Sequence, residues 1–495
     1  TKMKRYVITP RLPQVRKKLW TFRGLINQSI KMFQSFEFDP MCDKENPQII
    51  TFEDVSAASF RIQSGILKTP CVKSHMSMEY SMEIYLKADF LQHTGSFKER
   101  GARNALKLLS TEAKERGVIS ASLGNHAQGL SYHANELKIP ATVVMPNVAP
   151  IMKIQKCQSY GAEVIVYGHD MKEAKLHAMK LAKEKGLTYI NGYDHPHIMA
   201  GQGTLGLEII EQIPQVDAVL VPVGGGGLLA GVATAIKHLK PNVLIYGVES
   251  EKCPSMKHAI KNTQPTSVEI RPTLADGLAV PTIGYNAYAT AKPLMNKLVI
   301  NEDWIARAIL RLVELEKYVV EGGGAVGLAA IMAGLVPELI GKKVVCILSG
   351  GNIDTTILGR CLERGLAAEQ RLVKFKVTVS DRPGGIAELC RLISKIGVSI
   401  KDIMQERAWV YGDIFSVRVS VYYYYIDFFT ATKTKRAFII EKARPKCIIY
   451  QRYIGTKKWF GTGTLGLRDC HYTTFTIIVV HDKRRLLRQS LQTED

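Results

Sequence analysis

The chain has 495 residues, 46% of them hydrophobic and 22% charged, which allows a large buried core and about two to four globular domains. Its nine cysteines are scattered without a CxxC pair, so they indicate neither a zinc site nor a disulfide framework and fit a reducing compartment. The net charge of +21 lies mostly at the ends: residues 1–36 hold nine Lys and Arg and no acid, and residues 422–495 hold fourteen against six acids. Residues 37–421 therefore present no strong charge to a phosphate backbone, and nucleic-acid binding is not expected.

Residues 1–47 are predicted to be a basic N-terminal extension. The acid-free start is similar in composition to a mitochondrial transit segment but is poor in serine, so we expect a cytoplasmic location with a mitochondrial one as the alternative. No apolar stretch is long and clean enough for a transmembrane helix, and membrane association is not expected. The most apolar stretch, residues 325–340, is interrupted by glycine and by Pro337 and is predicted to be a buried helix.

Short β-branched runs alternate with helical patterns between residues 83 and 349. The runs are EIYLKADF, GVISAS, ATVVMP, AEVIVYG, AVLVPVGG, NVLIYGVES and KKVVCILSGG, and helical segments such as MKEAKLHAMKLAKEKG separate them. This alternation predicts an α/β fold in which mostly parallel sheets are wrapped by helices on both faces. Several runs are apolar throughout, as is typical of strands that are covered on both sides.

The pattern changes near residue 361. Residues 361–371 are predicted to be a polar helical linker, and residues 372–421 a small α+β domain with a βαβ start. In that domain LVKFKVTVS, VSIKDIMQER and DIFSVRVSV are predicted strands and IAELCRLISKIG an amphipathic helix. Residues 422–495 begin with four tyrosines and are basic and rich in aromatic residues, so they are predicted to be an atypical tail.

A GxGxxG spacing occurs three times, within residues 201–206, 322–327 and 461–466. A dinucleotide site needs a strand before this motif, a helix after it and an acidic residue about 20 positions on. None of the three has that context. They are interpreted as glycines of helix packing or of turns.

Four glycines in a row, Gly224, Gly225, Gly226 and Gly227, lie between an apolar strand and a helix. Consecutive backbone N–H groups of such a loop can point into one concavity at the positive end of the helix, which suits a phosphate group. No GK[ST] ending follows, so a nucleoside triphosphate loop is not indicated. The loop therefore predicts a cofactor that carries a phosphate, with a plain tight turn as the alternative.

Two further loops also follow predicted strands. SLGNHAQGL opens a helix and brings Ser122, Asn125 and His126, which could bind a carboxylate, and LSGGN places Ser349 at the end of a buried strand. Lys98 stands in HTGSFKERGARNAL directly before a helical run, where the alternative is an ordinary solvated charge. Because ligands of open α/β sheets bind at the carboxyl edge of the strands, we expect these residues to converge on one crevice.

A lysine, a phosphate cradle and a carboxylate-binding loop are what a pyridoxal 5'-phosphate enzyme requires. Over residues 48–360 the chain resembles the tryptophan-synthase-β-like group, the fold type II pyridoxal phosphate enzymes, and within it the serine/threonine dehydratases and serine racemases. The resemblance rests on five stretches in this order: TGSFKERGA, SLGNHAQG, AGQGTLGLE, GGGGLLAG and LSGGN. It implies a catalytic domain of two lobes.

The resemblance also implies a role for each matching residue. Lys98 looks like the Schiff-base lysine, Phe97 like the aromatic residue beside it, and Asn125 like the partner of the 3-oxygen of the cofactor ring. The four glycines look like the phosphate loop, and Ser349 like the partner of the pyridine nitrogen. Ser122, Asn125 and His126 would hold the substrate carboxylate, and the cofactor phosphate is the family's usual acid for the leaving hydroxyl.

Leu123 separates the two activities. Serine racemases carry a second catalytic serine at this position, directly before Gly-Asn-His, and a leucine cannot exchange a proton. Elimination, which needs Lys98 as the base, is therefore favoured over racemisation. The expected function is that of an L-threonine/L-serine dehydratase, an ammonia-lyase that forms 2-oxobutyrate or pyruvate. The alternatives are a serine racemase and a non-catalytic amino-acid sensor.

A metal site is not expected. Glu249 matches one carboxylate ligand of the racemase branch, but Ser255 stands where the second carboxylate would be, which should weaken binding of Mg²⁺ or Ca²⁺. The alternative is that Glu249 caps the end of its strand.

Residues 372–421 resemble an ACT domain through VTVSDRPGGIAELCRLISKIGVSI, in which Pro383, Gly384 and Gly385 precede the helix. The resemblance implies an amino-acid effector site and feedback regulation, and the catalytic part implies a homodimer or homotetramer. An ACT fold needs a second helix and a fourth strand, and neither pattern is evident after Val421. The domain is therefore expected to be incomplete and the tail to contribute nothing to it.

Overall fold

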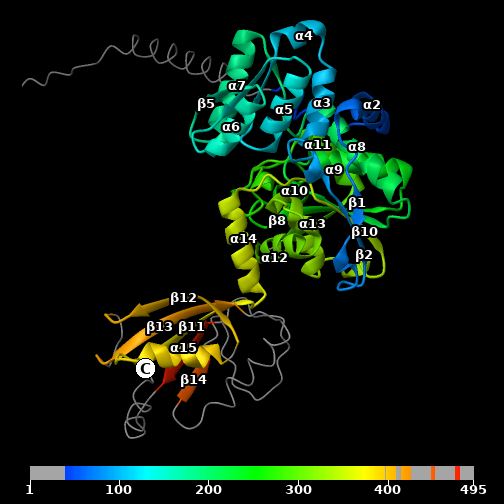
Figure 1. Cartoon of the computed structure of the whole chain (residues 1–495). Helices are drawn as coiled ribbons and strands as arrows, with labels where there is room; N and C mark the ends of the chain where they lie inside the picture. Colours follow the sequence, from blue (N-terminus) through cyan, green and yellow to red (C-terminus); the bar gives the residue numbers. More distant parts are fainter. Residues whose placement is uncertain are drawn as a thin grey trace, which may run out of the picture. The chain divides into compact units, whose positions relative to one another are not determined.

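A computed structural model describes residues 39–300, 302–395, 397–408, 414–424, 447–451 and 474–479 (Figure 1). The chain forms two compact units. The first consists of the residues up to Ile305 together with Leu315–Ile353, and the second of Ala306–Glu314 with the residues from Asp354 onward. Most of the expected N-terminal extension, residues 1–38, lies outside the described residues.

The elements of the first unit follow the predicted alternation. Its strands are β1 (Cys71–Lys73), β2 (Glu83–Lys87), β3 (Val118–Ala121), β4 (Ala141–Met145), β5 (Glu163–Val166), β6 (Thr188–Tyr189), β7 (Ala218–Pro222), β8 (Leu244–Ser250), β9 (Asn296–Ile300) and β10 (Lys343–Ile347). Its helices are α2 (Phe52–Ile62), α3 (Lys98–Lys107), α4 (Thr111–Arg116), α5 (Asn125–Glu136), α6 (Ile151–Ser159), α7 (Met171–Lys185), α8 (Pro196–Gln212), α9 (Gly227–Leu239), α10 (Ser255–Lys261), α11 (Tyr285–Ala291) and α13 (Gly322–Met332), while α12 (Glu302–Arg311) continues into the second unit.

Two sheets organise this unit. The larger has the order β1-β2-β10-β7-β8-β9 and is parallel except for the edge pair β1 and β2, and the smaller has the order β5-β4-β3-β6 and is parallel throughout. Helices α4 to α7 lie around the smaller sheet in Figure 1. Every residue of β4 and β7 is buried, as helices on both faces require. The predicted α/β fold with two mostly parallel lobes is confirmed.

The glycines of α8 allow unusually close helix packing. A Cβ on Gly201 would lie 2.6 Å from the Cα of Gly101 in α3, and one on Gly203 would lie 2.8 Å from the carbonyl oxygen of Gly231 in α9. The interpretation of this GxGxxG spacing as helix packing is confirmed. The second spacing lies in the buried helix α13, and the third is outside the described residues.

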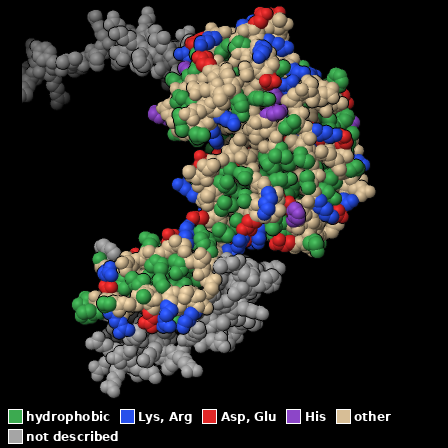
Figure 2. All heavy atoms as spheres, viewed as in Figure 1, with side chains coloured by type: hydrophobic (Ala, Val, Ile, Leu, Met, Phe, Trp, Pro, Cys, Tyr) green, Lys and Arg blue, Asp and Glu red, His purple; other side chains and the backbone are tan. Residues whose placement is uncertain are grey.

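Residues 325–340 do not form one helix. Helix α13 ends at Met332, and a short 3-10 helix, Pro337–Leu339, follows after a turn at Gly334. In the described part of the chain, no helix has the length and apolar character needed to cross a membrane. Figure 2 shows Lys and Arg side chains interspersed with Asp and Glu over the visible face of the first unit.

The second unit contains α14 (Thr355–Ala368), β11 (Leu372–Ser380), α15 (Gly385–Ser394), β12 (Ser399–Glu406), β13 (Ser416–Tyr424), β14 (Cys447–Gln451) and β15 (Thr474–Val479). Its sheet has the order β12-β13-β11-β15-β14. The helical linker and the strand and helix positions up to Val421 agree with the sequence. Helix α14 starts before the expected boundary at residue 360 and packs on this unit, because Gly365 lies against Ala306 and Leu310.

The structure differs from the expectation after Val421. Strand β13 runs on to Tyr424, since Tyr422 pairs with Lys374 of β11 and the Tyr423 ring contacts Phe375 at a centroid distance of 5.8 Å. Strands β14 and β15 come from the segment that was expected to add nothing, and β15 pairs in parallel with β11. The sequence did not predict these strands because the segment is basic and rich in aromatic residues.

Candidate active site

Lys98 is the first residue of α3, and Phe97 at the preceding cap position makes no side-chain cap. The half-buried Lys98 side chain donates a hydrogen bond from Nζ to the carbonyl oxygen of Gly192 at 2.6 Å. Burial lowers the pKa of Lys98 to about 8, and the charge of Glu321 partly opposes this. An amine with a lowered pKa can act as a nucleophile and as a base near neutral pH.

Asn125, the first residue of α5, is held from two sides. Its Nδ2 donates to Oε1 of Glu321 at 2.7 Å, and its Oδ1 accepts from Nδ2 of Asn352 at 2.9 Å. Asn352 belongs to the LSGGN loop, and its Nδ2 also donates to the carbonyl oxygen of Thr94 at 2.7 Å. The two loops that were expected to converge are therefore in direct contact with the segment just before Lys98.

Glu321 is a buried carboxyl that the sequence reasoning missed. It stands at the cap position of α13, and burial raises its pKa to about 7, with a further rise from Asp276 and opposing effects of Lys153, Asn125 and Lys98. The only sequence signal was an acid directly before the glycine triplet of a GxGxxG spacing, which was assigned to packing alone.

His126 is buried and neutral. Burial and the charge of Lys98 lower its pKa to about 3, and Nε2 lies 3.3 Å from the carbonyl oxygen of Ile190, so Nε2 carries the hydrogen. Its Nδ1 is buried without a hydrogen-bond partner among the described residues. Nearby, the Ser122 hydroxyl oxygen accepts from the N–H of Gly124 at 3.3 Å. His126 thus contributes no positive charge to this loop.

The tetraglycine loop connects β7 to α9. Gly226 has a φ of +91°, and Gly225 and Gly227 pack so closely on Tyr193 that a Cβ on either would collide with it. No side chain caps α9, so its first backbone N–H groups remain available for an anion. The loop contacts Tyr193, and Gly192, next to Tyr193, is the residue that bonds Lys98.

Ser349 follows β10 and is buried. Its carbonyl oxygen accepts from the N–H of Phe97 at 3.0 Å, and the Phe97 ring packs against the core of the larger sheet. The segment that contains Lys98 thus contacts the Ser349 loop directly, and Asn352 of that loop contacts Asn125. The glycine loop joins them through residues 191–195, which the sequence reasoning did not single out.

Glu249 contacts the first turn of the helix that follows its strand. Its Oε1 accepts from the N–H of Met256 at 2.5 Å and its Oε2 from the N–H of Lys257 at 3.0 Å, so it binds the start of α10. Over the described ranges, no group of three or more His, Cys, Asp or Glu is placed to hold a metal ion.

These residues fit a cofactor with a phosphate and an aldehyde. The uncapped start of α9 beside Gly226 offers N–H groups to a phosphate, and the Lys98 amine has the lowered pKa that bond formation with an aldehyde needs. Asn125 and the buried Ser349 are further polar residues of the two loops that meet near Lys98.

The sequence profile of the pyridoxal-phosphate dependent enzymes matches residues 62–350. An L-threonine ammonia-lyase of Thermotoga maritima is 42% identical over 362 residues, which cover 73% of this chain and 90% of that protein. An L-threonine ammonia-lyase of Geobacter sulfurreducens is 41% identical over 355 residues, or 71% of this chain and 88% of that protein.

Two solved structures are similar as well. The processed form of threonine deaminase isoform 2 from Solanum lycopersicum has a TM-score of 0.60 and 33% identity, covering 64% of this chain and 95% of that one. Maize serine racemase has a TM-score of 0.61 and 28% identity, and the match covers 64% of this chain and 98% of that one. Together with the site, these likenesses establish that the chain belongs to the family of pyridoxal-phosphate dependent enzymes.

Proposed function

We propose that the chain is an L-threonine ammonia-lyase that also accepts L-serine, and that it forms 2-oxobutyrate or pyruvate with release of ammonia. The observation that carries this proposal is the Lys98 amine, which is bonded to Gly192 and has a lowered pKa, in a chain 42% identical to an L-threonine ammonia-lyase. Bound pyridoxal phosphate withdraws electrons from Cα of the amino acid.

Lys98 would hold the cofactor and then act as the base that removes the Cα proton. Its pKa of about 8 leaves a useful fraction of the amine unprotonated near neutral pH. The hydrogen bond to the Gly192 carbonyl oxygen orients Nζ and keeps one of its hydrogens occupied. The same lysine cannot serve the opposite face of Cα.

The substrate carboxylate would bind at the start of α5. The backbone N–H groups of the first helical turn are free of intrahelical partners and carry the positive end of the helix dipole. The Ser122 hydroxyl and the Asn125 side chain would add polar contacts. The neutral His126 ring would contribute shape only, because its Nδ1 has no hydrogen to donate to a carboxylate. Leu123 in this loop has no proton to give, which favours elimination.

Regulation, assembly and location extend the proposal. The second unit, with its Pro383-Gly384-Gly385 turn before α15, would bind an amino-acid effector, and the first unit would assemble as a homodimer or homotetramer. A cytoplasmic location fits the relatives named above. Size-exclusion chromatography with light scattering and an assay of activity against added free amino acids would test these points.

The decisive experiment compares products. Purified protein loaded with pyridoxal phosphate should be yellow, borohydride should bleach the colour, and L-threonine should yield 2-oxobutyrate. The Lys98→Ala variant should lose the bleachable band and activity by roughly 10²–10⁴-fold, whereas Lys185→Ala, at an exposed position of α7, should retain both. Maize serine racemase is a structural neighbour, so L-serine should be tested in parallel. Appreciable D-serine with little keto acid would overturn the proposal.

A further inference from the structure

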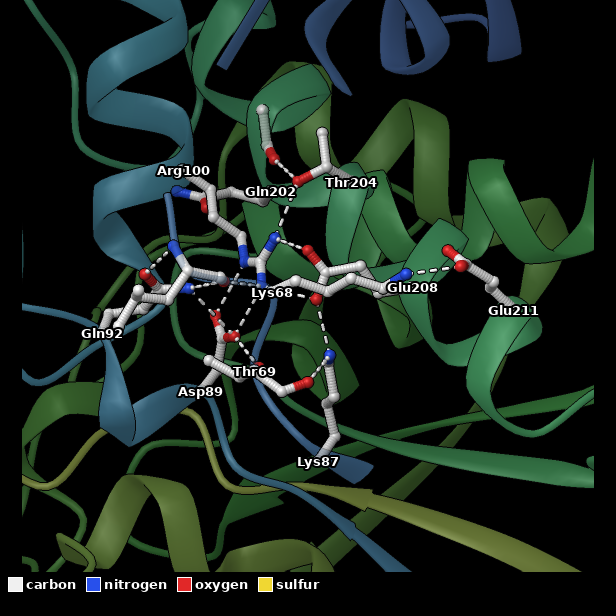
Figure 3. A network of polar contacts seen from close by, with 12 residues as sticks. Lys68, Thr69, Lys87, Asp89, Gln92, Arg100, Gln202, Thr204, Glu208 and Glu211 are labelled. Atoms are coloured by element: carbon white, nitrogen blue, oxygen red, sulfur yellow. Dashed lines mark hydrogen bonds and ion pairs between the residues drawn. The ribbon is translucent and has the colours of Figure 1, made fainter. Parts of the chain in front are cut away.

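Three buried charged side chains and one partly exposed one form a network beside the start of α3, which we call the charged quartet: Lys87, Asp89, Arg100 and Glu208 (Figure 3). Lys87 and Asp89 are fully buried, Arg100 is 1% exposed and Glu208 is 16% exposed. Two positive and two negative charges balance. The side-chain hydrogen bonds of the quartet join its members to one another and to Thr69, Gln92, Thr204, Gln212 and the carbonyl oxygen of Leu67. Among the described residues, none of these bonds goes to Lys98, Asn125 or Ser349.

Arg100 binds two carboxylates at once. Its Nε and one terminal nitrogen donate to the two oxygens of Asp89 at 2.9 and 2.7 Å, and its two terminal nitrogens donate to the two oxygens of Glu208 at 2.6 and 2.9 Å. Thr204 accepts a further bond at 3.2 Å. A planar guanidinium that is bidentate on both sides fixes direction as well as distance.

Lys87 completes the network from β2. Its Nζ donates to the carbonyl oxygen of Thr69, to Oε2 of Glu208 at 2.6 Å and to Oε1 of Gln212 at 2.9 Å. Although burial would raise the pKa of Asp89, the Arg100 guanidinium lowers it, so the carboxylate is charged. Burying four charges costs several kcal/mol per ion before pairing, and an apolar cluster of the same size is often as stable. The quartet is therefore better explained by a need to fix the relative positions of the elements that carry it than by a gain in stability.

The elements that the quartet ties together are those that place Lys98. Arg100 is two residues after Lys98 in α3. Glu208 lies on α8, which begins four residues after Gly192, the acceptor of the Lys98 hydrogen bond. Between these points the helices touch at Gly101 and Gly201. Glu208 lies about 18 Å along α8 from its first residue, Pro196, which closely follows Gly192 in the chain. The hydrogen bonds between Arg100 and Glu208 and the one between Lys98 and Gly192 therefore hold α3 at two separate places.

We propose that the charged quartet positions Lys98 for proton transfer, with Arg100 and Glu208 as positioning residues that hold α3 against α8. The proposal rests on the proposed function. Weakening the paired hydrogen bonds between Arg100 and Glu208 would let α3 shift relative to the segment that contains Gly192. The Lys98 amine would then be displaced from its working position while the fold persists. Misplacement by about 1 Å is enough to cost 10²-fold in rate.

The test compares Glu208→Gln with Glu211→Gln. Glu211 lies on the same helix but is 65% exposed, and its ion pair with the exposed Lys68 is separate from the quartet. For each full-length variant we would measure the cofactor content, the turnover of L-threonine per loaded site, the isotope effect with threonine deuterated at Cα, and the rate at which apoenzyme takes up pyridoxal phosphate.

Glu208→Gln should lower turnover per loaded site roughly 10- to 100-fold, change KM by less than about threefold, and raise the isotope effect because proton removal becomes more limiting. Its uptake of the cofactor should also slow. Glu211→Gln should match the unaltered protein in all four. Glu208→Asp keeps the charge and shortens the arm, so it should fold and give intermediate values even if Glu208→Gln fails to accumulate.

Normal turnover per loaded site in Glu208→Gln and Glu208→Asp, or fewer loaded sites with normal turnover at each, would overturn the proposal and leave the quartet a stability element. The proposed function fails separately, if the unaltered protein makes no 2-oxobutyrate. In that case slow cofactor uptake by Glu208→Gln, set against Glu211→Gln, would still support positioning, and equal uptake would overturn it.

Discussion

At the scale of the residue, Glu321 shows how one buried group can serve several neighbours. Its carboxyl accepts from Asn125, and its charge raises the pKa of Lys98 against the effect of burial. It also leaves no room at Gly350, where a Cβ would collide with it. With a pKa of about 7, Glu321 changes charge within the range in which the enzyme would work.

Glu321→Gln should change how the stability of the apoenzyme depends on pH. The folded-state pKa of Glu321 is raised from 4.5 to about 7, so the folded state binds more protons than the unfolded state between these values and loses stability as the pH rises through them. The loss is on the order of 3 kcal/mol or less. Glutamine does not titrate, so the free energy of unfolding of the variant should rise relative to that of the unaltered apoenzyme between pH 5 and pH 8.

Urea unfolding of both proteins at pH 5 and pH 8 measures this difference. A free-energy difference between variant and unaltered protein that is equal at the two pH values would contradict it. In Glu321→Gln the amide oxygen of the new side chain can still accept from Asn125, so the variant keeps the local hydrogen bond that a change to alanine would remove.

Single site residues were predictable where a short sequence motif indicates their chemistry. Lys98, Asn125 and Ser349 each stand in such a stretch, and the structure brings them to one place. Glu321 and Gly192 were not predictable, because each acts on a residue far away in sequence: Glu321 on Asn125 and Gly192 on Lys98. Such partners appear only once the two lobes are assembled.

At the scale of the element, the tetraglycine loop is shaped by what lies behind it. A Cβ on Gly227 would collide with the Tyr193 carbonyl oxygen, which is backbone and cannot swing aside. The loop, the start of α9 and residues 191–195 therefore form one packed layer. The glycines are needed for this close approach and not only for turning the chain.

Gly227→Ala should weaken cofactor binding at least tenfold, because either α9 or the Tyr193 segment must move. Titration of the apoenzyme with pyridoxal phosphate, followed by visible absorbance, measures the change. Gly359→Ala is the matched control: it lies on the exposed face of α14 with no atom within 4 Å of the added Cβ, and it should bind normally and gain up to about 1 kcal/mol in stability. Equal affinities for the two variants would contradict the role of the close packing.

The strands were predictable because runs such as those of β4 and β7 are apolar throughout, which marks strands covered on both faces. Their division into two sheets was not, since pairing register depends on contacts between distant segments. β6 and β1 are too short to give a pattern. In the second unit, composition misled, because the tyrosines of β13 pack across β11 rather than beginning a separate tail.

At the scale of the whole molecule, the second unit depends on its last strand. β15 pairs with β11 from Lys374 to Thr378, on the side of β11 opposite to β13. A chain that ends at Tyr424 would lose this pairing and leave a row of unpaired backbone groups on a central strand. Exposed strand edges promote association between molecules.

We therefore expect a chain that ends at Tyr424 to aggregate at concentrations at which the full chain stays dispersed, while its first unit still takes up pyridoxal phosphate. Light scattering against concentration tests the first point and visible absorbance the second. If the shortened chain stayed as dispersed as the full one, residues 425–495 would be dispensable to the second unit.

The strand order of the larger sheet bears on how the protein is made. β10 lies between β2 and β7, and its register joins Lys343 to Glu83, 260 residues earlier in the chain. At a synthesis rate of about 5–20 residues per second, β2 leaves the ribosome roughly 13–50 s before its neighbour exists. The smaller sheet lies wholly within that interval and can fold on the nascent chain, whereas the larger one keeps an open gap at its centre until translation of the first unit is complete. A pause or early stop before residue 343 would release a polypeptide with a finished small lobe and a split large one, the kind of product that chaperones and proteases must remove.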